Sequence, residues 1–393
     1  MTADVVVLGA GYAGAGAVKR FENEVDAGEA NLTWVSEQDY HLVLHEVHRV
    51  IRNPAVESKV AIPVSEIKSS STDFVQDRVT GVDTDERTVQ VEDGDDVDYD
   101  YLLVALGSAT AFYGIEGLEE YSHTLKSLDD ARAIHEDVKE AAAEASRTDP
   151  AQVVVGGAGL SGIQTAGEIA EYRDKHRAPI DIKLVEGLDE IFPGNDPELQ
   201  GALRKRLEEA DIDILTGDFI SKVDEETIYI GGGEDEEPEE LPYDVSVWTG
   251  GITGQEEVAG ANVEKDERSN RIYADMDFQT SDDRVFAIGD SALIDQGDDE
   301  FAPPTAQAAW GAAEVAGENL ARSVRGAPLK SWSHTDKGTL VSVGEEAVAH
   351  GVDPLPIDTF GGFGAKFLKK AVAVRWIADV TSLGRGLNAW SDM

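Results

Sequence analysis

The chain has 393 residues, enough for two domains and a small additional segment, and no apolar run approaches the about 18 residues that a membrane-spanning helix needs. Its 78 acidic residues against 33 lysines and arginines give a net charge of −45, which disfavours nucleic acid as a ligand because its phosphates would be repelled. The chain contains no cysteine, which excludes disulfide bonds, cysteine-ligated metals and thiol redox chemistry.

The first predicted element is a buried strand at residues 5–8, followed by a Gly-x-Gly-x-x-Gly turn and a helix from about residue 15. In such a unit, Gly9 allows the tight turn, Gly11 lets backbone approach a pyrophosphate, and Gly14 lets helix and strand pack closely. Free amides at the helix start hold the phosphate charge. The strand before the turn and the helix after it favour dinucleotide binding over an ordinary tight turn.

A second strand is predicted at 32–35 and ends at Ser36 and Glu37. In a dinucleotide-binding unit, an acid at the end of this strand accepts hydrogen bonds from a ribose. Glu37 has the chemistry for this contact, whereas Ser36 offers a weaker hydrogen bond. Both residues remain candidates.

Three histidines follow at spacings of four and three residues, which would place them on one face of a helix: His41, His45 and His48. A metal site is conceivable, but no fourth ligand is evident. The neighbouring Glu46 and Arg49 favour a solvated or interdomain face.

Further strands are predicted between 72 and 91, with a turn at 83–86, and at 101–106, where the strand ends in Gly107. A ligand can approach the carboxyl end of that last strand. Residues 127–145 are rich in Ala, Glu and Lys and begin with an Asp pair, which predicts a helix.

The opening pattern then repeats with a strand at 153–155, a second Gly-x-Gly-x-x-Gly at 157–162 and a helix at 163–174. The next strand, 182–185, ends in Glu186, at a spacing that suits contact with a ribose. An acid at this position favours NAD(H) over NADP(H), because it repels a 2′-phosphate. Two such units about 150 residues apart are unlikely to arise by chance.

The polar stretch 231–240 is predicted to be the tip of a hairpin, and 245–251 a strand that returns to a glycine turn. A strand at 284–288 is followed by Gly-Asp, and Asp290 can accept a hydrogen bond from a sugar-like hydroxyl. An Ala-rich helix is predicted at about 306–322, and its N-terminal dipole is available to a ligand.

The segment 361–393 is basic, unlike the rest of the chain. Its charged residues are Lys366, Lys369, Lys370, Arg375 and Arg385, against Asp379 and Asp392. Interleaved with them are Phe363, Phe367, Leu368, Trp376, Ile377 and Trp390. A basic, aromatic, amphipathic stretch is typical of a helix on an anionic bilayer. The alternative is a helix that packs against acidic neighbours or a second subunit.

With these motifs the chain resembles the flavoproteins of the pyridine nucleotide–disulfide reductase superfold and, more closely, the type II NADH dehydrogenases, which are non-pumping NADH:quinone oxidoreductases. The match covers most of the chain. Its more specific motifs are Leu-Lys-Ser-Leu-Asp-Asp-Ala at 125–131, Pro-Pro-Thr-Ala-Gln at 303–307 and Asp-Lys-Gly-Thr-Leu at 336–340.

The resemblance implies an α/β fold of two Rossmann-like domains, the second inserted in the first, with a small C-terminal segment. The implied boundaries are 1–113 and 280–330 for an FAD-binding domain, 114–279 for an NAD(H)-binding domain, and 331–393 for a membrane-surface or dimerisation segment.

The resemblance also implies cofactor contacts, residue by residue. FAD would contact Gly9, Gly11, Tyr12, Ala13, Gly14, Glu37, Gly107, Asp290, Ala306 and Gln307. NADH would contact Gly157, Gly159, Gly162, Glu186 and Gly251. The residues expected closest to the chemistry are Gln307, Gln164 and Lys369, the last as the family's basic residue near flavin and quinone.

The chain departs from the family pattern at three places. The family carries an acid at the position of Ser36, a Glu at that of Gln164, and a pair of quinone-site glutamines where this chain has Gly311 and Ala312. The last change keeps open an NADH-dependent reductase of a soluble electron carrier as an alternative to a quinone reductase. The changes at Ser36 and Gln164 keep open a redox-sensing flavoprotein without turnover. Sulfide:quinone oxidoreductases and disulfide reductases need redox cysteines, which this chain lacks.

We therefore expect an intracellular protein on the inner face of the cell membrane, docked peripherally on anionic lipid through 361–393, with homodimerisation as a further implication of the resemblance. The acidic residues are spread along the whole chain, which favours a surface adapted to high salt over one that binds a cationic partner.

Overall fold

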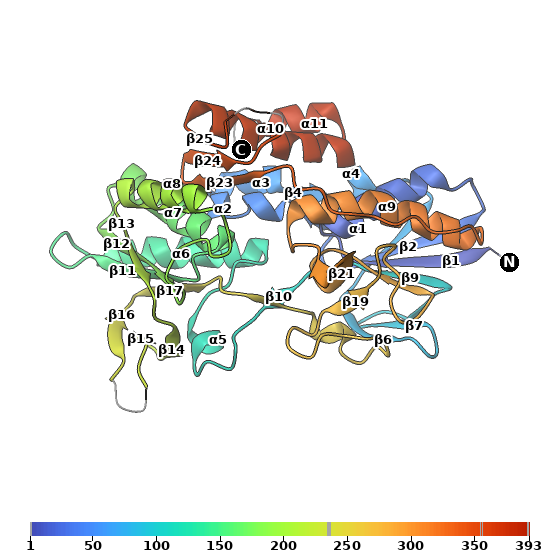
Figure 1. The fold of residues 1–393 in the computed structure, drawn as a ribbon, viewed down its shortest axis with the longest axis horizontal. Coiled ribbons are helices and arrows are strands. Elements are labelled where there is room, and N and C mark those ends of the chain that lie inside the picture. The colour runs from blue at the N-terminus through green and yellow to red at the C-terminus, as the bar shows by residue number, and fades with distance from the viewer. Residues whose placement is uncertain (1, 234–236, 354, 356, 391–392) are drawn as a thin grey trace.

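The computed structural model describes residues 2–233, 237–353, 355, 357–390 and 393. Two α/β units lie side by side, each built on a parallel sheet, and the C-terminal strands and helices lie across both units (Figure 1). The predicted fold class, with two Rossmann-like units and a small C-terminal segment, is confirmed.

The first sheet is parallel throughout. In spatial order its strands are β20 (Val285–Ala287), β9 (Tyr101–Val104), β1 (Ala3–Leu8), β2 (Ala30–Ser36) and β5 (Thr72–Gln76). The central strand β1 is fully buried from Val5 to Leu8. A continuous apolar run is what a parallel strand covered on both faces requires.

Helices α1 (Tyr12–Glu24) and α9 (Ala306–Val324) pack against each other at unusually short range. A Cβ atom added at Gly317 would lie 2.5 Å from the carbonyl oxygen of Ala17, and one added at Gly16 would lie 2.7 Å from Ala313 Cβ. The small residues of both helices therefore allow this close contact.

The second sheet is also parallel. Its strands are β13 (Ile212–Thr216), β12 (Ile180–Glu186), β11 (Ala151–Gly156) and β17 (Val245–Trp248). The helices of this unit are α6 (Leu128–Glu144), α7 (Leu160–His176) and α8 (Pro197–Glu209). Helix α7 extends beyond the predicted range at both ends.

Smaller antiparallel sheets and short helices complete the two units. The sheets are β6 (Val79–Asp83) with β7 (Thr88–Val91) and β8 (Val97–Asp98); β14 (Ile220–Val223) with β15 (Thr227–Ile230) and β16 (Glu239–Pro242); and β3 (Tyr40–Leu42) with β4 (Ala61–Pro63). The short helices are η1 (Leu44–Glu46), α2 (Arg49–Arg52), η2 (Pro54–Val56), α3 (Glu57–Val60), α4 (Val64–Ile67), α5 (Leu118–Tyr121), η3 (Glu256–Val258) and η4 (Gly289–Ser291). The predicted hairpin at 231–240 is confirmed by the pairing of β15 with β16, while 234–236 lie outside the described residues.

The chain crosses between the units through two short strands, β10 (Ala109–Thr110) and β18 (Ile252–Thr253), which pair with each other. The residues that follow β18 make their contacts with the first unit. Strand β19 (Ile272–Ala274) pairs with β21 (Ala292–Gly297), which in turn pairs with β22 (Glu300–Phe301), and the Asn262 amide donates to Thr84 Oγ1. We therefore propose that the second unit ends near residue 253, rather than at 279.

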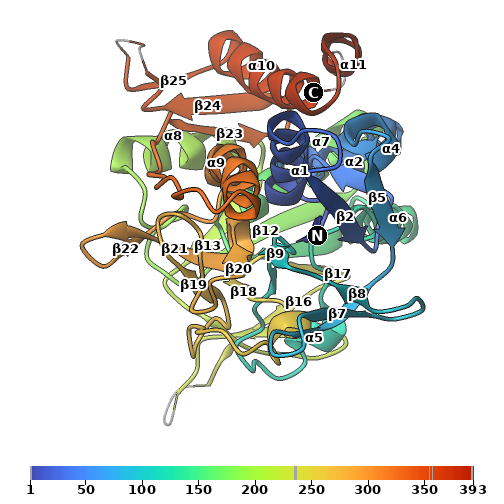
Figure 2. The same ribbon diagram turned by 90° about the vertical axis from the view of Figure 1, so that its right-hand side faces the viewer.

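The C-terminal segment is a small sheet followed by two helices. Its elements are β23 (Thr339–Val343), β24 (Glu346–His350), β25 (Thr359–Gly361), α10 (Phe363–Val380) and α11 (Leu383–Ala389). Figure 2 shows both helices along one edge of the molecule, above α1 and α7. Within the described ranges, no helix is long and apolar enough to cross a membrane.

Candidate functional site

The first glycine turn has the geometry that its spacing predicts. Gly9 has a φ of +97°, and a Cβ there would lie 2.4 Å from the carbonyl oxygen of Ala105. A Cβ at Gly14 would lie 2.0 Å from the Gly9 carbonyl oxygen, so strand and helix meet closely. At Gly11, by contrast, no atom of the described chain lies within 4 Å of the Cβ position. The middle glycine therefore opens onto free space.

The second glycine turn repeats this pattern. Gly157 has a φ of +87°, and a Cβ at Gly162 would lie 1.9 Å from the Gly157 carbonyl oxygen. Gly159 opens onto space that no described atom fills within 4 Å. Gly11 and Gly159 are also the N-cap residues of α1 and α7, so no side chain caps either helix. Their first amides are left without a side-chain cap, so the two turns are candidate phosphate cradles.

Glu186 holds the second glycine turn in place. Its Oε2 accepts from the Ala158 amide at 2.9 Å, and its Oε1 accepts from the Leu188 amide at 3.1 Å. Each carboxylate oxygen can accept a second hydrogen bond, so the side chain can still receive a sugar hydroxyl.

In the first unit, Ser36 is the last residue of β2 and is buried, whereas Glu37 lies just beyond the strand and is exposed. The Glu37 carboxylate accepts no hydrogen bond from the described residues. It is therefore the more available of the two for a ribose, although its role stays a prediction.

Gly107 and Asp290 meet at the carboxyl edge of the first sheet. Gly107 follows β9 with a φ of +75°, and nothing in the described chain lies within 4 Å of its Cβ position. Asp290 follows β20, and its carbonyl oxygen accepts from Arg271 Nε at 2.9 Å. Ser291 Oγ donates to the Gly107 carbonyl oxygen at 3.0 Å and joins the two turns.

Ala306 and Gln307 begin helix α9, which Thr305 caps by accepting from the Ala308 amide. The carboxamide of Gln307 accepts from the Lys337 amide at 2.7 Å and donates to the Gly338 carbonyl oxygen at 3.3 Å. Gln307 thus joins two of the specific motifs, 303–307 and 336–340, and fixes the start of the C-terminal segment over α9.

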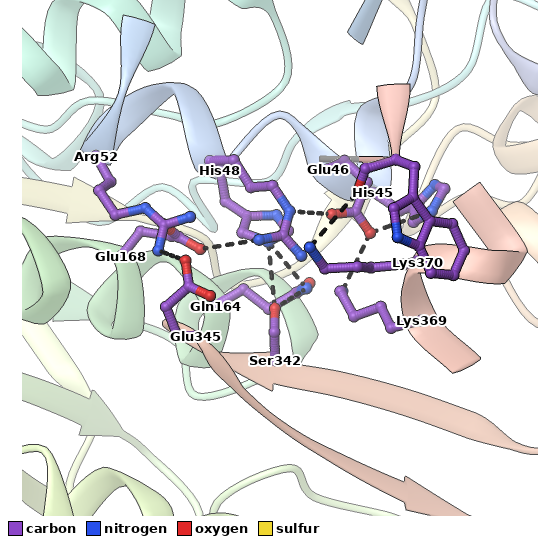
Figure 3. Close-up of polar contacts among 12 residues, drawn as sticks. His45, Glu46, His48, Arg52, Gln164, Glu168, Ser342, Glu345, Lys369 and Lys370 are labelled. Carbon is purple, nitrogen blue, oxygen red and sulfur yellow. Dashed lines mark hydrogen bonds and ion pairs between the residues drawn. The ribbon is translucent and has the colours of Figure 1, made fainter. Parts of the chain in front are cut away.

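Gln164 lies in α7 with only 3% of its surface exposed. Its Nε2 donates to Ser342 Oγ at 3.0 Å and to His48 Nε2 at 3.3 Å (Figure 3). Burial and the charge of Lys369 hold the pKa of His48 well below its ordinary value, so the imidazole is neutral and its nitrogen can accept. The three residues come from three parts of the fold: the segment before α2, helix α7 and strand β23.

Lys369 is buried beside Glu46, whose Oε1 lies 3.4 Å from its Nζ (Figure 3). Arg49 Nε pairs with the other oxygen of Glu46. Burial opposes the ionisation of Glu46, but Lys369 and Arg49 together hold its pKa below the ordinary value. Burial lowers the pKa of Lys369, and Glu46 opposes this shift. The predicted site residues Gln164 and Lys369 therefore border one buried polar cluster.

A second buried carboxylate, Glu168, lies one helical turn after Gln164. Arg52 Nε is 3.0 Å from its Oε2, and Arg49 Nη1 is 3.9 Å from its Oε1. Burial raises the pKa of Glu168 to about 7, although both arginines oppose this. Arg52 also pairs with Glu345 after β23, so the charges link helix α7 to the C-terminal sheet.

The prediction of one helical face for the three histidines is wrong. His41 lies in β3, His45 in η1, and His48 precedes α2. The segment changes direction between them, because apolar residues at 43, 47, 50 and 51 are all drawn into the core. The solvated alternative is also wrong for His41 and His48, which are buried, while the contacts of His48 with α7 and β23 fit an interdomain position.

His41 is held by two contacts: its Nδ1 donates to the Ala10 carbonyl oxygen at 2.7 Å, and its Nε2 accepts from Trp376 Nε1 at 2.8 Å. Burial lowers its pKa to about 4, so it is neutral. His45 bonds to the Tyr12 hydroxyl. Among the described residues no group of three potential ligands is arranged to hold a metal ion.

The side chain of Tyr113 packs against Gly251. A Cβ at Gly251 would lie 1.8 Å from the Tyr113 hydroxyl oxygen, so this glycine accommodates the phenol. Of the two residues at the quinone-site glutamine positions, Ala312 is fully buried, while a Cβ at Gly311 would lie 3.4 Å from Trp332 Nε1.

Sequence reasoning did not identify several of the polar partners in this cluster. From the sequence, Glu46 and His48 are predicted only to lie on a solvated or interdomain face, and no prediction covers Ser342. The one available signal was their position: each lies between apolar residues that turned out to be core.

Comparison with known proteins places these features in context. Residues 3–313 match the family model described as pyridine nucleotide-disulphide oxidoreductase. The chain is 28% identical over 399 residues to a Staphylococcus aureus (strain MSSA476) protein named type II NADH:quinone oxidoreductase, and the match covers 97% of this chain and 96% of that protein. The resemblance seen in the sequence is confirmed.

Two solved structures support the fold. NDH2 from Plasmodium falciparum, in complex with NADH, superimposes with a TM-score of 0.85 at 16% identity, covering 100% of this chain and 97% of that one. The sulfide:quinone oxidoreductase from Aquifex aeolicus gives a TM-score of 0.81 at 18% identity, covering 96% and 91%. At these identities the likeness shows the fold alone.

Proposed function

The chain belongs to the pyridine nucleotide-disulphide oxidoreductase family, and from this membership we propose that it is an FAD-dependent NADH dehydrogenase that passes electrons to a quinone. The observation that carries the proposal is the pair of open glycines, Gly11 and Gly159, each at the uncapped start of a helix that follows a parallel strand. Two such cradles suit two dinucleotides.

The second cradle is assigned to NADH. Glu186 ends β12 beside this cradle, where a carboxylate binds a free 2′-hydroxyl and repels a 2′-phosphate. The first cradle is assigned to FAD, since Asp290 and the start of α9 lie on the same unit. The Staphylococcus aureus relative is named for NADH and a quinone, and the Plasmodium falciparum protein was solved with NADH.

In this proposal FAD, when bound, supplies the hydride and electron chemistry, while the protein binds and orients the reactants. The glycine turns bind the phosphates, and Asp290 binds a sugar hydroxyl. Gln164, fixed by His48 and Ser342, borders the place where the two units meet. Lys369 supplies a buried cation close to it.

The quinone is favoured as acceptor by the exposed apolar face of the C-terminal helices. On α10, Phe363 is 84% exposed and Phe367 is 51% exposed; on α11, Leu383 is 68% exposed and Leu387 is 59% exposed. Each pair is spaced four residues apart and so lies on one side of its helix. The opposite side of α10 is buried through Ala365 and Trp376.

We infer that this face docks on a lipid surface, where a quinone is dissolved. Helix α10 has features of both alternatives drawn from the sequence, a packing helix and a helix on a bilayer. Trp376 packs on Tyr12 with ring centroids 4.6 Å apart, and Lys366 pairs with Glu346 at 2.9 Å, as in a packing helix. Phe363 and Phe367 on α10, and Leu383 and Leu387 on α11, are instead exposed, as in an interfacial helix. A homodimer through the same face is the other occupant to test.

Replacing Phe363, Phe367, Leu383 and Leu387 by serine should release the protein from vesicles. Even partial burial of four such side chains contributes ~3 kcal/mol, so we expect the partition coefficient to fall about a hundredfold. Because the contact is apolar, binding of the unchanged protein should persist in concentrated KCl, which screens charge. Flotation with vesicles measures both.

The matched control is the double change Phe219→Ser and Phe301→Ser, which removes exposed aromatic side chains outside α10 and α11. It should bind vesicles as the unchanged protein does. If the fourfold variant still floats, the membrane role fails. If instead it converts a dimer to a monomer without changing flotation, the face is a subunit interface.

The proposed activity is tested by steady-state NADH oxidation in concentrated KCl. We expect turnover with a short-chain quinone. Oxidation of NADH with a soluble ferredoxin-type protein but not with the quinone would favour the carrier-reductase alternative. Reduction of bound flavin without turnover on either acceptor would favour the redox-sensing alternative.

A further inference from the structure

The structure assigns a role to Lys126 and Ser108, which rests on the proposed binding of FAD to the first unit. We propose that they are positioning residues that orient the carboxylate of Asp290 toward a sugar hydroxyl of FAD. The three side chains come from three places in the chain: the loop before α6, the loop between β9 and β10, and η4, which follows β20.

The loop that carries Lys126 is fixed by the first turn of α6. Ser127 Oγ accepts from the Asp130 amide at 3.0 Å, and Asp130 Oδ2 accepts from the Ser127 amide at 3.0 Å, which is a capping box. The same Asp130 oxygen accepts from the Lys126 amide at 2.7 Å and from Thr124 Oγ1 at 3.1 Å. The hydrogen bonds to Asp130 therefore fix the backbone of Lys126 and of Ser127, the residue that follows it.

From this loop the Lys126 side chain reaches the edge of the first sheet. Its Nζ donates to Ser108 Oγ at 3.0 Å, and Ser108 Oγ donates to Asp290 Oδ2 at 3.3 Å. The two end groups fix both directions, because an ammonium group can only donate and an ionised carboxylate can only accept. With its lone pair engaged by Lys126, the Ser108 hydroxyl turns its proton toward Asp290.

This arrangement leaves one oxygen of Asp290 for a ligand. Its Oδ1 accepts no hydrogen bond from any residue that the structure describes. The backbone of Asp290 is separately fixed, since Arg271 donates to its carbonyl oxygen at 2.9 Å and to that of Ala292 at 2.6 Å. Rotation of the carboxylate is the remaining freedom, and the Lys126–Ser108 relay restricts it.

The environment of Lys126 fits such a role. Burial lowers the pKa of Lys126, and Asp290 and Asp130 oppose this shift, so the carboxylates keep a partly desolvated ammonium charged. Lys126 has further N–H donors beyond the one that Ser108 accepts. This cation also offsets the negative charge of Asp290 next to a cofactor that carries phosphates.

The test compares FAD dissociation constants of full-length variants, measured by recovery of flavin fluorescence on release. We expect Lys126→Met and Ser108→Ala each to weaken FAD binding about tenfold, since each removes a hydrogen bond of a charge-assisted pair. The double variant should be no weaker than the worse single variant, because both act through one relay. Lys126→Arg should stay within about threefold of the unchanged protein.

Lys139→Met is the matched control, because Lys139 lies exposed on α6 and its ion pair among the described residues is with Glu136. It should bind FAD normally. Thermal unfolding of the apoproteins separates positioning from folding: the relay predicts similar midpoints for the Lys126 and Ser108 variants. Equal FAD affinity of Lys126→Met and the unchanged protein would overturn the proposal, and so would effects that multiply in the double variant. If the unchanged protein binds no FAD, the proposed function fails instead.

Discussion

Replacing Gly159 by valine should give a folded, FAD-loaded protein that NADH reduces poorly. The backbone tolerates valine, since Gly159 has a φ of −75° and a ψ of −169° and no described atom lies within 4 Å of the Cβ position. The new side chain would instead occupy the approach to the start of α7, where a pyrophosphate must contact backbone. We expect kcat/KM for NADH to fall at least about a hundredfold, because a 1 Å displacement of a bound reactant can have an effect of this size.

The corresponding change in the first cradle tests the assignment of that cradle to FAD. Gly11 has the same extended backbone and the same free space, so Gly11→Val should fold and lose FAD. Gly201→Val serves as the control, since its Cβ position is also free of described atoms but lies on α8, away from both cradles. Rapid reduction of the Gly159→Val protein at low NADH concentration would contradict the assignment of the second cradle.

Replacing Glu46 by alanine should destabilise the fold by ~3–5 kcal/mol, because it leaves the buried cations of Lys369 and Arg49 without their carboxylate. Chemical denaturation of the holoprotein at neutral pH measures this change. Glu136→Gln is the control: its pairing with Lys139 is exposed, and such pairs contribute ~0–1 kcal/mol.

The double change Glu46→Gln with Lys369→Met should recover part of the lost stability. Removing both charges avoids the uncompensated ammonium that the single change creates. If Glu46→Ala and Glu136→Gln unfold at the same denaturant concentration, the buried cluster does not hold the C-terminal helix in place.

The parts of the fold that sequence predicts well are those in which one local pattern decides the outcome. The strand at 5–8 and the helix at 127–145 follow from a fully apolar run and from an N-cap Ser with an acidic first turn. The boundary that we propose for the second unit, near 253, does not follow from such a pattern. It depends on β19 pairing with β21, a contact between segments that carry no special local pattern.

In the candidate site, too, the sequence predicts the local features but not the contacts between distant segments. Both glycine turns and the positions of Glu186 and Asp290 follow from spacing, because their geometry is local to a strand and a helix. The partners of Gln164 and Lys369 do not. His48 and Ser342 lie far from Gln164 in sequence, and only the packing of α7 between α2 and β23 brings them together. A buried Glu46 looks like a surface residue until its cationic partners are known.

The extreme negative charge also bears on the lipid contact. An anionic bilayer repels a protein with a net charge of −45, so the docking that we propose would rest on the apolar face of α10 and α11 together with screening by salt. Adaptation of the surface to high salt stays a prediction of the composition. It is consistent with a docking surface that is apolar at Phe363 and Leu383.

An anaerobic titration of the flavin absorbance tests whether one chain binds FAD and NADH so that hydride passes between them. The flavin band should bleach with about one equivalent of NADH, respond far less to NADPH because of Glu186, and return when a short-chain quinone is added. A flavin band that stays unchanged in excess NADH would show that no hydride passes from NADH to the flavin.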